Sequence, residues 1–448
     1  MRRQGAVIVW GKAVRGTIGV NRVDVVPSSS VQSPPPFWKI VLAVVSFALA
    51  VLIWVSGLIS SLTRPSVAPT LSLQQQELTF LAEPSVPPQL RQLLVSADPR
   101  GVLLDALQDS PPAQRTSRQE LLLMLLEPEP DAEVPVLDDA SRDDPLLNRL
   151  RCEALGGSAV GCIDPAVAQA AALRLGISVF LPLLSVLLGS GLLLRRLWTL
   201  FRSEQTPWPP LQGPALSLLD MVLLVAGGFV VIGAAGVPLV AAPILQALTQ
   251  GLVSPRREAF DVVVNYSVMA LPSLLILRRQ LSALRGEHGP REGWLQWRLQ
   301  PPLSAMTSAL AGWLMVTPVV MLTGWLLVQL VGDPGGSNPL LELVLNSRDG
   351  VALGLLAFTA VVLAPLFEEV IFRGALLPVL AKRLGVRWGI VLSGLLFGLA
   401  HISIGELAPL TVLGIGLAIL RISSGRLLPC VLMHALWNGI TFVNLLLL

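Results

Sequence analysis

Residues 367–373 read Phe-Glu-Glu-Val-Ile-Phe-Arg, which places two carboxylates and a guanidinium within an otherwise apolar run. A charged residue at the centre of a membrane helix costs about 2.5 to 3.5 kcal/mol, so its presence needs an explanation. Glu369 and Arg373 are four residues apart and share one face of a helix, whereas the adjacent Glu368 points about 100° away. We therefore expect Glu369 to pair with Arg373, which leaves Glu368 for another role.

Two interpretations of this cluster are open from the sequence. In one, Glu368 is a general base that takes a proton from water in a poorly hydrated pocket. In the other, the three ionisable side chains form a structural ion-pair network, or mark the cytoplasmic end of a helix whose long side chains reach the interface. The residues around two histidines favour the first interpretation.

These histidines lie in other predicted membrane helices of the same region. The chain has only three histidines, and His401 and His434 each lie one helical turn from a distinctive neighbour, Phe397 and Asn438. Counted from the predicted cytoplasmic ends of their helices, these polar residues and Glu368 lie within one or two turns of a common depth. A single histidine in a membrane helix more often stabilises helix packing. Similar depths on three helices favour one shared polar site.

The composition places the chain in a lipid bilayer. Of its 448 residues 53% are hydrophobic and 14% are charged, which is too little polar surface to cover a soluble protein of this size. The formal net charge of +3 comes from basic residues that mostly flank apolar runs. Such residues set the orientation of membrane helices, so we expect a multi-pass membrane protein and no nucleic-acid partner.

The apolar runs predict an all-α polytopic helical bundle with about nine transmembrane spans and a soluble, mainly helical insert between the first two. Acidic residues and prolines are concentrated in this insert. The last four spans are expected near 351–380, 388–404, 407–420 and 427–448. We divide the chain into a disordered cytoplasmic tail at 1–36, a first transmembrane helix at 37–62, the exoplasmic insert at 63–166, transmembrane helices 2–4 with their loops at 167–302, and a membrane domain with the polar site at 303–448.

Basic flanks also predict the orientation of the chain. Positively charged loops stay in the cytoplasm, which places the N-terminus inside and both the insert and the C-terminus outside. Arg256 and Arg257 oppose this assignment because they fall on a predicted outer loop. No cleavable signal or transit peptide is evident, so we expect a bacterial inner membrane. Cys152 and Cys162 lie close together in the insert, where either a disulfide or two free thiols fits the sequence.

The polar residues of the last third resemble the motifs of a known family, the CAAX-protease and bacteriocin-processing (CPBP, Abi) intramembrane endopeptidases. Each motif is weak alone, but their order and spacing agree, and the resemblance covers about 303–448. The matching residues are Glu368, Glu369 and Arg373 for Glu-Glu-x-x-x-Arg, Phe397 and His401 for Phe-x-x-x-His, and His434 and Asn438 for His-x-x-x-Asn.

This resemblance implies a site that hydrolyses peptide bonds, with 303–448 as a CAAX-protease-like catalytic domain. It implies that Glu368 and His401 activate the attacking water. His434 and Asn438 would stabilise the oxyanion or contribute to the site. Arg373 would position the carboxylate of Glu369. A divalent metal, zinc, at Glu368, His401 and His434 is left open.

We therefore expect an endopeptidase whose substrate is a membrane-associated protein or peptide within the lipid bilayer. A proton-coupled transporter and a non-catalytic scaffold of the same fold are the alternatives. Clustering of the ionisable residues in one terminal third, with no detected repeat, disfavours a transporter. Complete motifs disfavour a scaffold. The sequence identifies neither the partner of the insert at 63–166 nor whether the substrate is prenylated.

Overall fold

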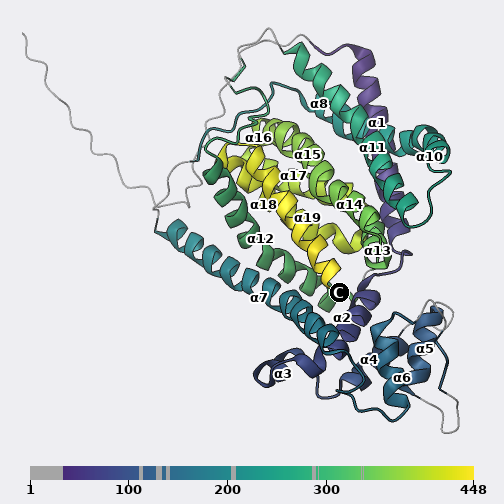
Figure 1. Cartoon of the computed structure of the whole chain (residues 1–448). Coiled ribbons are helices and arrows are strands. Elements are labelled where there is room, and N and C mark those ends of the chain that lie inside the picture. The colour runs from purple at the N-terminus through teal and green to yellow at the C-terminus, as the bar shows by residue number, and fades with distance from the viewer. Residues whose placement is uncertain are drawn as a thin grey trace, which may run out of the picture.

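The computed structural model describes residues 34–109, 115–127, 134–137, 142–202, 208–284, 289–290, 292–333, 335–336 and 338–448. Within these residues every regular element is a helix, which confirms the predicted all-α polytopic bundle (Figure 1). The cytoplasmic tail expected at 1–36 lies outside the described residues except for its last three positions.

Eight of the described helices are long and apolar enough to cross a membrane, so the chain is an integral multi-pass membrane protein. Apolar side chains on the outer faces of these helices are exposed, as lipid-facing residues are. The eight helices are α1 (Phe37–Ser61), α7 (Pro165–Phe201), the helix Leu218–Leu248, α11 (Arg256–Ala283), α12 (Pro302–Val331), the helix Gly350–Leu384, α18 (Ile404–Ser424) and α19 (Leu428–Leu447).

The span predicted at 388–404 is shorter than expected. It forms α17 (Val386–Ala400), whose 15 residues are too few to cross a hydrocarbon core of about 30 Å at about 1.5 Å per residue. The helix ends because Ile402, two residues after Ala400, has φ 50° and leaves the right-handed helical conformation. Among the described residues there are therefore eight helices long enough to span a membrane and one shorter apolar helix, in place of about nine full spans.

Two of the long helices are interrupted by π-helical turns. The helix Gly350–Leu384 consists of α14 (Gly350–Phe358), α15 (Ala364–Glu369) and α16 (Leu377–Leu384), joined by π turns at Thr359–Leu363 and Val370–Leu376. The helix Leu218–Leu248 likewise joins α8 (Leu218–Val222), α9 (Gly233–Gly236) and α10 (Ala242–Leu248) through π turns at Leu223–Ile232 and Val237–Ala241. Such turns often occur at functional sites, and one directly follows the paired glutamates.

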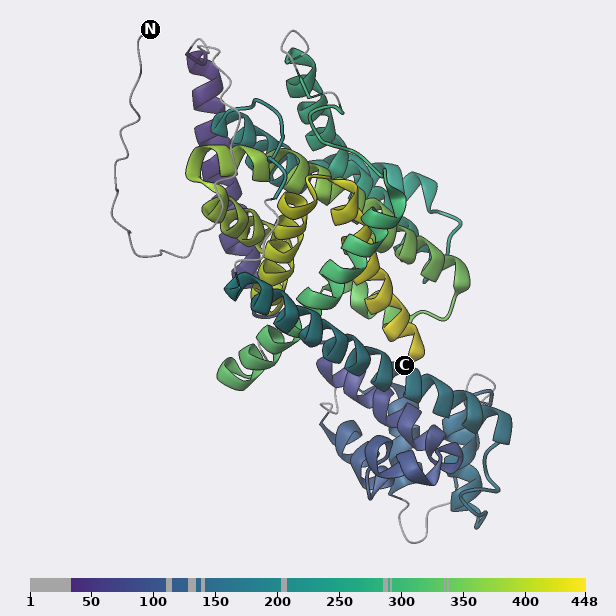
Figure 2. The same ribbon diagram turned by 90° about the vertical axis from the view of Figure 1, so that its left-hand side faces the viewer.

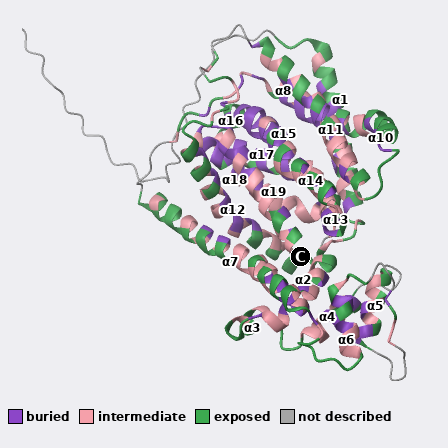
Figure 3. Ribbon diagram, viewed as in Figure 1, coloured by how far each residue is buried: buried purple, intermediate pink, exposed green. Residues whose placement is uncertain are grey.

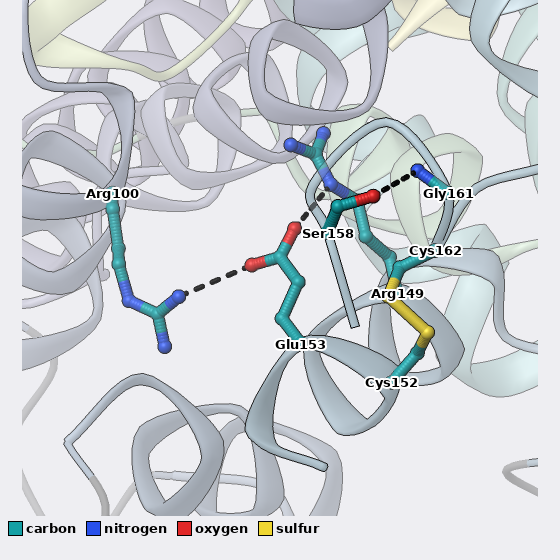
Figure 4. The surroundings of a disulfide bond; sticks show 7 residues. All are labelled: Arg100, Arg149, Cys152, Glu153, Ser158, Gly161 and Cys162. Atoms are coloured by element: carbon teal, nitrogen blue, oxygen red, sulfur yellow. Dashed lines mark hydrogen bonds and ion pairs between the residues drawn. A yellow bond between two sulfur atoms is a disulfide. The ribbon is translucent and has the colours of Figure 1, made fainter. Parts of the chain in front are cut away.

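The insert projects from one end of the membrane helices, beside the C-terminus (Figures 1 and 2). It contains a leucine core of its own, with Leu103, Leu107 and Leu122 fully buried. A disulfide joins Cys152, within the last helix of the insert, to Cys162 in the loop that follows it, beside Glu153 and its arginine partners (Figure 4). Its elements are α2 (Ala68–Ala82), a 3-10 turn (Glu83–Ser85), α3 (Pro88–Leu94), α4 (Pro99–Gln108), α5 (Ser117–Leu126) and α6 (Pro145–Ala154).

Burial is concentrated where α15, α16, α17 and α18 meet (Figure 3). Glycines let α17 and α18 approach closely: a Cβ built on Gly414 would lie 2.9 Å from the Cα of Gly394, and one on Gly398 would lie 2.8 Å from the carbonyl oxygen of Leu407. Small residues therefore serve tight helix packing here, as they do in other membrane bundles. This contact holds α17 against α18. The short α13 (Pro339–Asn346) completes the bundle.

Candidate active site

The buried centre of the site is a polar cluster on two helices. Glu369 and Arg373 are fully buried, and Arg373 Nη1 donates a hydrogen bond to Glu369 Oε1 at 3.0 Å. His434 of α19 brings Nδ1 within 3.0 Å of the same oxygen. Arg373 Nη2 donates to the carbonyl of Gly414 in α18, also at 3.0 Å. The expected Glu369–Arg373 contact is thus present. The other two hydrogen bonds connect this pair to α18 and α19.

Glu368 has a different set of neighbours. Its Oε1 accepts a hydrogen bond from the hydroxyl of Tyr266 in α11 at 2.7 Å, and its Oε2 lies 3.9 Å from His434 Nε2. Although the side chain is largely buried, Oε2 has no hydrogen-bond partner among the described residues. An unsatisfied carboxylate oxygen is costly in such surroundings, so Oε2 is available to accept a hydrogen bond from a substrate or a water.

The ring of His434 links the two carboxylates. Its Nδ1 faces Glu369 and its Nε2 faces Glu368. An imidazolium carries a proton on both ring nitrogens, so in that form His434 can act as a donor on both of these sides.

Phe397 contacts both histidines and Arg373. Its ring packs beneath the Arg373 guanidinium, with the guanidinium carbon 4.4 Å from the ring centroid. The rings of His401 and His434 have centroids 4.9 and 5.6 Å from that of Phe397. His401 Nδ1 lies 2.9 Å from the Phe397 carbonyl oxygen, which can only accept a hydrogen bond. In a neutral imidazole the proton therefore sits on Nδ1 and leaves Nε2 as an acceptor.

Asn438 lies one helical turn beyond His434 on α19. Its Nδ2 donates to the carbonyl of Ala360, in the π turn Thr359–Leu363, at 2.7 Å. The structure therefore joins four of the expected residues, Glu368, Glu369, Arg373 and His434, through polar contacts or short approaches. His401 reaches them through the Phe397 ring, and Asn438 through the backbone of the neighbouring helix.

Sequence reasoning missed Tyr266. It comes from α11, far from the motifs in the chain, yet its hydroxyl makes a direct hydrogen bond to Glu368. Its ring also packs edge-on against Phe367, with centroids 6.0 Å apart. One signal was available, because Tyr266 is the only tyrosine in the sequence and lies within an apolar span.

The side chains as placed do not form a metal site. Across the described ranges, no group of three or more His, Cys, Asp or Glu side chains is arranged to hold a metal ion. Glu368 and His434 approach one another, but His401 is engaged with Phe397. Since a catalytic zinc site needs three protein ligands, zinc at Glu368, His401 and His434 stays a prediction, and no chemical step below depends on it.

Comparison with known proteins identifies families that two parts of the chain resemble. Residues 350–440 match the family model described as type II CAAX prenyl endopeptidase Rce1-like, a range narrower than the expected 303–448 that still includes all six candidate residues. Residues 68–141 and 134–173, in the insert and the start of α7, match a domain of unknown function, DUF8675. No curated protein and no solved structure matches the chain. Residues 350–440 of this membrane protein are therefore similar to the Rce1-like type II CAAX prenyl endopeptidase family.

Proposed function

We propose that this chain is an intramembrane endopeptidase that hydrolyses a peptide bond of a membrane-associated protein or peptide, with Glu368 as the base that activates water. The observation that carries the proposal is the contrast between two adjacent glutamates. Each glutamate has one oxygen without a hydrogen-bond partner among the described residues, but Glu369 is paired with Arg373. Glu368 makes no ion pair with an arginine or lysine among these residues, and its free oxygen lies 3.9 Å from His434 Nε2. A carboxylate in that setting is suited to general-base catalysis.

The first step is attack by water on the scissile carbonyl. Glu368 Oε2 accepts a proton from the water as its oxygen bonds to the carbonyl carbon. The Tyr266 hydroxyl, bound to Oε1, keeps the carboxylate in one orientation. His401 contacts the same water through Nε2, the nitrogen that its bond to the Phe397 carbonyl leaves as an acceptor.

The second requirement is a donor for the oxyanion that forms on the carbonyl oxygen. His434 supplies it from Nε2, while Nδ1 donates to Glu369 and fixes the ring. Asn438, one turn further along α19, adds a second polar group to this wall of the site. Glu368 then passes its proton to the leaving amine, the C–N bond breaks, and the base is restored.

We also propose an orientation for the chain, in a bacterial inner membrane with the N-terminus cytoplasmic and the insert outside. The insert and the C-terminus lie at the same end of the bundle, because Arg174 near the start of α7 donates to the carbonyls of Leu447 and Leu448. The Cys152–Cys162 disulfide supports an oxidising compartment on that side.

The test compares protein termini in cells that express either the wild-type chain or Glu368→Gln. Termini are identified by mass spectrometry of membrane fractions. Glu342→Gln is the matched control, since Glu342 is exposed on α13 and is not one of the candidate site residues. We expect a set of cleavages that wild type and the control produce and Glu368→Gln does not. Identical termini in all three strains, with the proteins equally expressed and folded, would favour a scaffold or a transporter.

A further inference from the structure

The loop between α17 and α18 holds His401 next to a strained residue. Ile402 has φ 50°, in the left-handed region, where a β-branched side chain is rarely found. Such a conformation persists only where the surrounding structure enforces it, and it is concentrated at functional sites. The contacts of this loop therefore show what keeps His401 in place.

The end of α1 supplies one side of the constraint. Arg64, three residues after α1, donates a hydrogen bond from Nη2 to the carbonyl of Ile402. The Ile402 side chain packs against the backbone of Gly57, and a methyl group added to Gly57 would overlap that side chain. Ser61 accepts a hydrogen bond at Oγ from the backbone N–H of Ile404 at 3.1 Å. Backbone and side chain of the loop are thus both held by α1.

The segment before α13 supplies the other side. The Gly336 N–H donates to the carbonyl of Arg64 at 3.1 Å, and the Gly336 carbonyl accepts from Ser403 Oγ at 2.6 Å. The Asn338 N–H donates to Glu406 Oε1 at 3.2 Å. Glu406 in turn interacts electrostatically with both His401 and Arg64. We call the residues Gly57, Ser61, Arg64 and Gly336 the strap.

We infer that the strap positions His401 for catalysis, and that Arg64 is a positioning residue of the enzyme. Both residues lie outside the range that matches the endopeptidase family: Gly57 near the end of α1, and Arg64 at the junction between α1 and the insert. The effect that we expect on turnover rests on the proposed function. The placement of His401 can be measured without turnover.

The placement test uses diethyl pyrocarbonate, which carbethoxylates accessible histidines, on the full chain in detergent. Mass spectrometry gives the separate rates at His401, which is partly exposed, and at the buried His434, which serves as an internal reference. We expect Arg64→Ala and Gly57→Ala to raise the rate at His401 several-fold without changing the rate at His434. Arg64→Lys keeps a cationic donor and restores much of the wild-type rate.

Two matched controls separate the strap from general effects. Arg256→Ala removes another arginine from the same end of the bundle, where it pairs with Asp349. Gly354→Ala adds a methyl group in a membrane helix where nothing lies within 4 Å. Both controls should react like wild type. If Arg64→Ala does not fold, Gly57→Ala decides the question alone.

Turnover provides a second readout. It is measured on a substrate that the comparison of protein termini identifies. A misplaced His401 lowers kcat by about tenfold or more with KM unchanged, because small displacements of a catalytic group are costly. If His401 is carbethoxylated at the wild-type rate in both Arg64→Ala and Gly57→Ala, the inference is wrong, whether or not the chain cleaves peptides. Absence of Glu368-dependent cleavage by the wild type would instead refute the proposed function.

Discussion

At the scale of single residues, the site separates two glutamates that are neighbours in the sequence. Their Cα–Cβ directions diverge on the helix, so Glu369 meets Arg373 and His434 while Glu368 meets Tyr266. This divergence was predictable from the sequence, because it follows from helical geometry alone. The identity of the Glu368 partner was not, because Tyr266 is brought there by the packing of α11.

Replacing the base tests the role of Glu368. Glu368→Gln keeps the size of the side chain and can still accept from Tyr266, but its amide cannot take a proton from water. We expect kcat to fall by about 10² to 10⁴-fold, the usual contribution of a general base, with the protein still folded in detergent. The measurement is the cleavage rate beside size-exclusion and thermal-unfolding profiles. A variant that keeps the wild-type rate would remove Glu368 from the mechanism.

Loss of Arg373 should act on stability first. Arg373→Met would leave the Glu369 carboxylate buried without its counter-charge, which costs about 3 to 5 kcal/mol when one partner of a buried pair is removed. Thermal unfolding in detergent should show a large decrease in midpoint. Arg256, which forms an exposed ion pair with Asp349, provides the comparison, and Arg256→Ala should unfold at the same temperature as wild type. Equal unfolding midpoints for the two variants would contradict the buried-pair account.

Tyr266→Phe isolates one hydroxyl. The ring contact with Phe367 is kept, but Glu368 Oε1 loses its hydrogen-bond donor. We expect a lower kcat with little change in KM, by about tenfold, which corresponds to about 1.4 kcal/mol of transition-state stabilisation. Kinetics on the substrate from the termini comparison measure both constants. An unchanged kcat would show that Tyr266 is only a packing residue.

At the scale of elements, the apolar runs predicted which segments are helices better than where they end. The run at 388–404 is mostly apolar, yet α17 stops at Ala400 because the loop with Ile402 is shaped by Arg64 and Gly336. Those residues are distant in the sequence, so no local pattern signals the break. The π turns beside Glu369 are likewise set by packing, and hydrophobic periodicity does not reveal them.

Close packing of α17 on α18 gives a prediction at this scale. Gly414→Ala would place a methyl group against the backbone of Gly394 and push the two helices apart. Overpacking of this kind costs about 1 to 3 kcal/mol. It should also displace Arg373, whose Nη2 bonds to the Gly414 carbonyl, and so lower activity. Thermal unfolding and cleavage rate measure the two effects, and Gly354→Ala should change neither.

At the scale of the whole molecule, the chain combines a membrane domain with an insert that has a separate core. The composition predicted both, because a bilayer needs apolar helices and the acidic, proline-rich stretch does not suit one. The three motifs predicted one shared polar site. Glu368, Glu369, Arg373 and His434 lie together, whereas His401 and Asn438 make their hydrogen bonds to backbone carbonyls. The role of the insert does not follow from its composition, since a helical core of leucines is compatible with many partners.

Topology is tested by the cysteines. A membrane-impermeant thiol reagent added from outside should label Cys152 and Cys162 only after reduction, because the disulfide blocks both sulfurs. Cys430 is buried in α19 and should stay unlabelled in the folded protein. Intact cells are labelled, their membranes are then prepared, and the labelled cysteines are identified by mass spectrometry. Labelling of the pair only from the cytoplasmic side would reverse the proposed orientation.

The most direct test of the central claim is to follow oxygen from water into the product. Purified wild-type and Glu368→Gln proteins are incubated in H₂¹⁸O with solubilised host membranes from cells that lack the chain, and new C-termini are analysed by mass spectrometry. Hydrolysis by a Glu368-activated water predicts new C-termini that carry one ¹⁸O with wild type and are missing with Glu368→Gln. New termini that form equally with both proteins, or with neither, would contradict it.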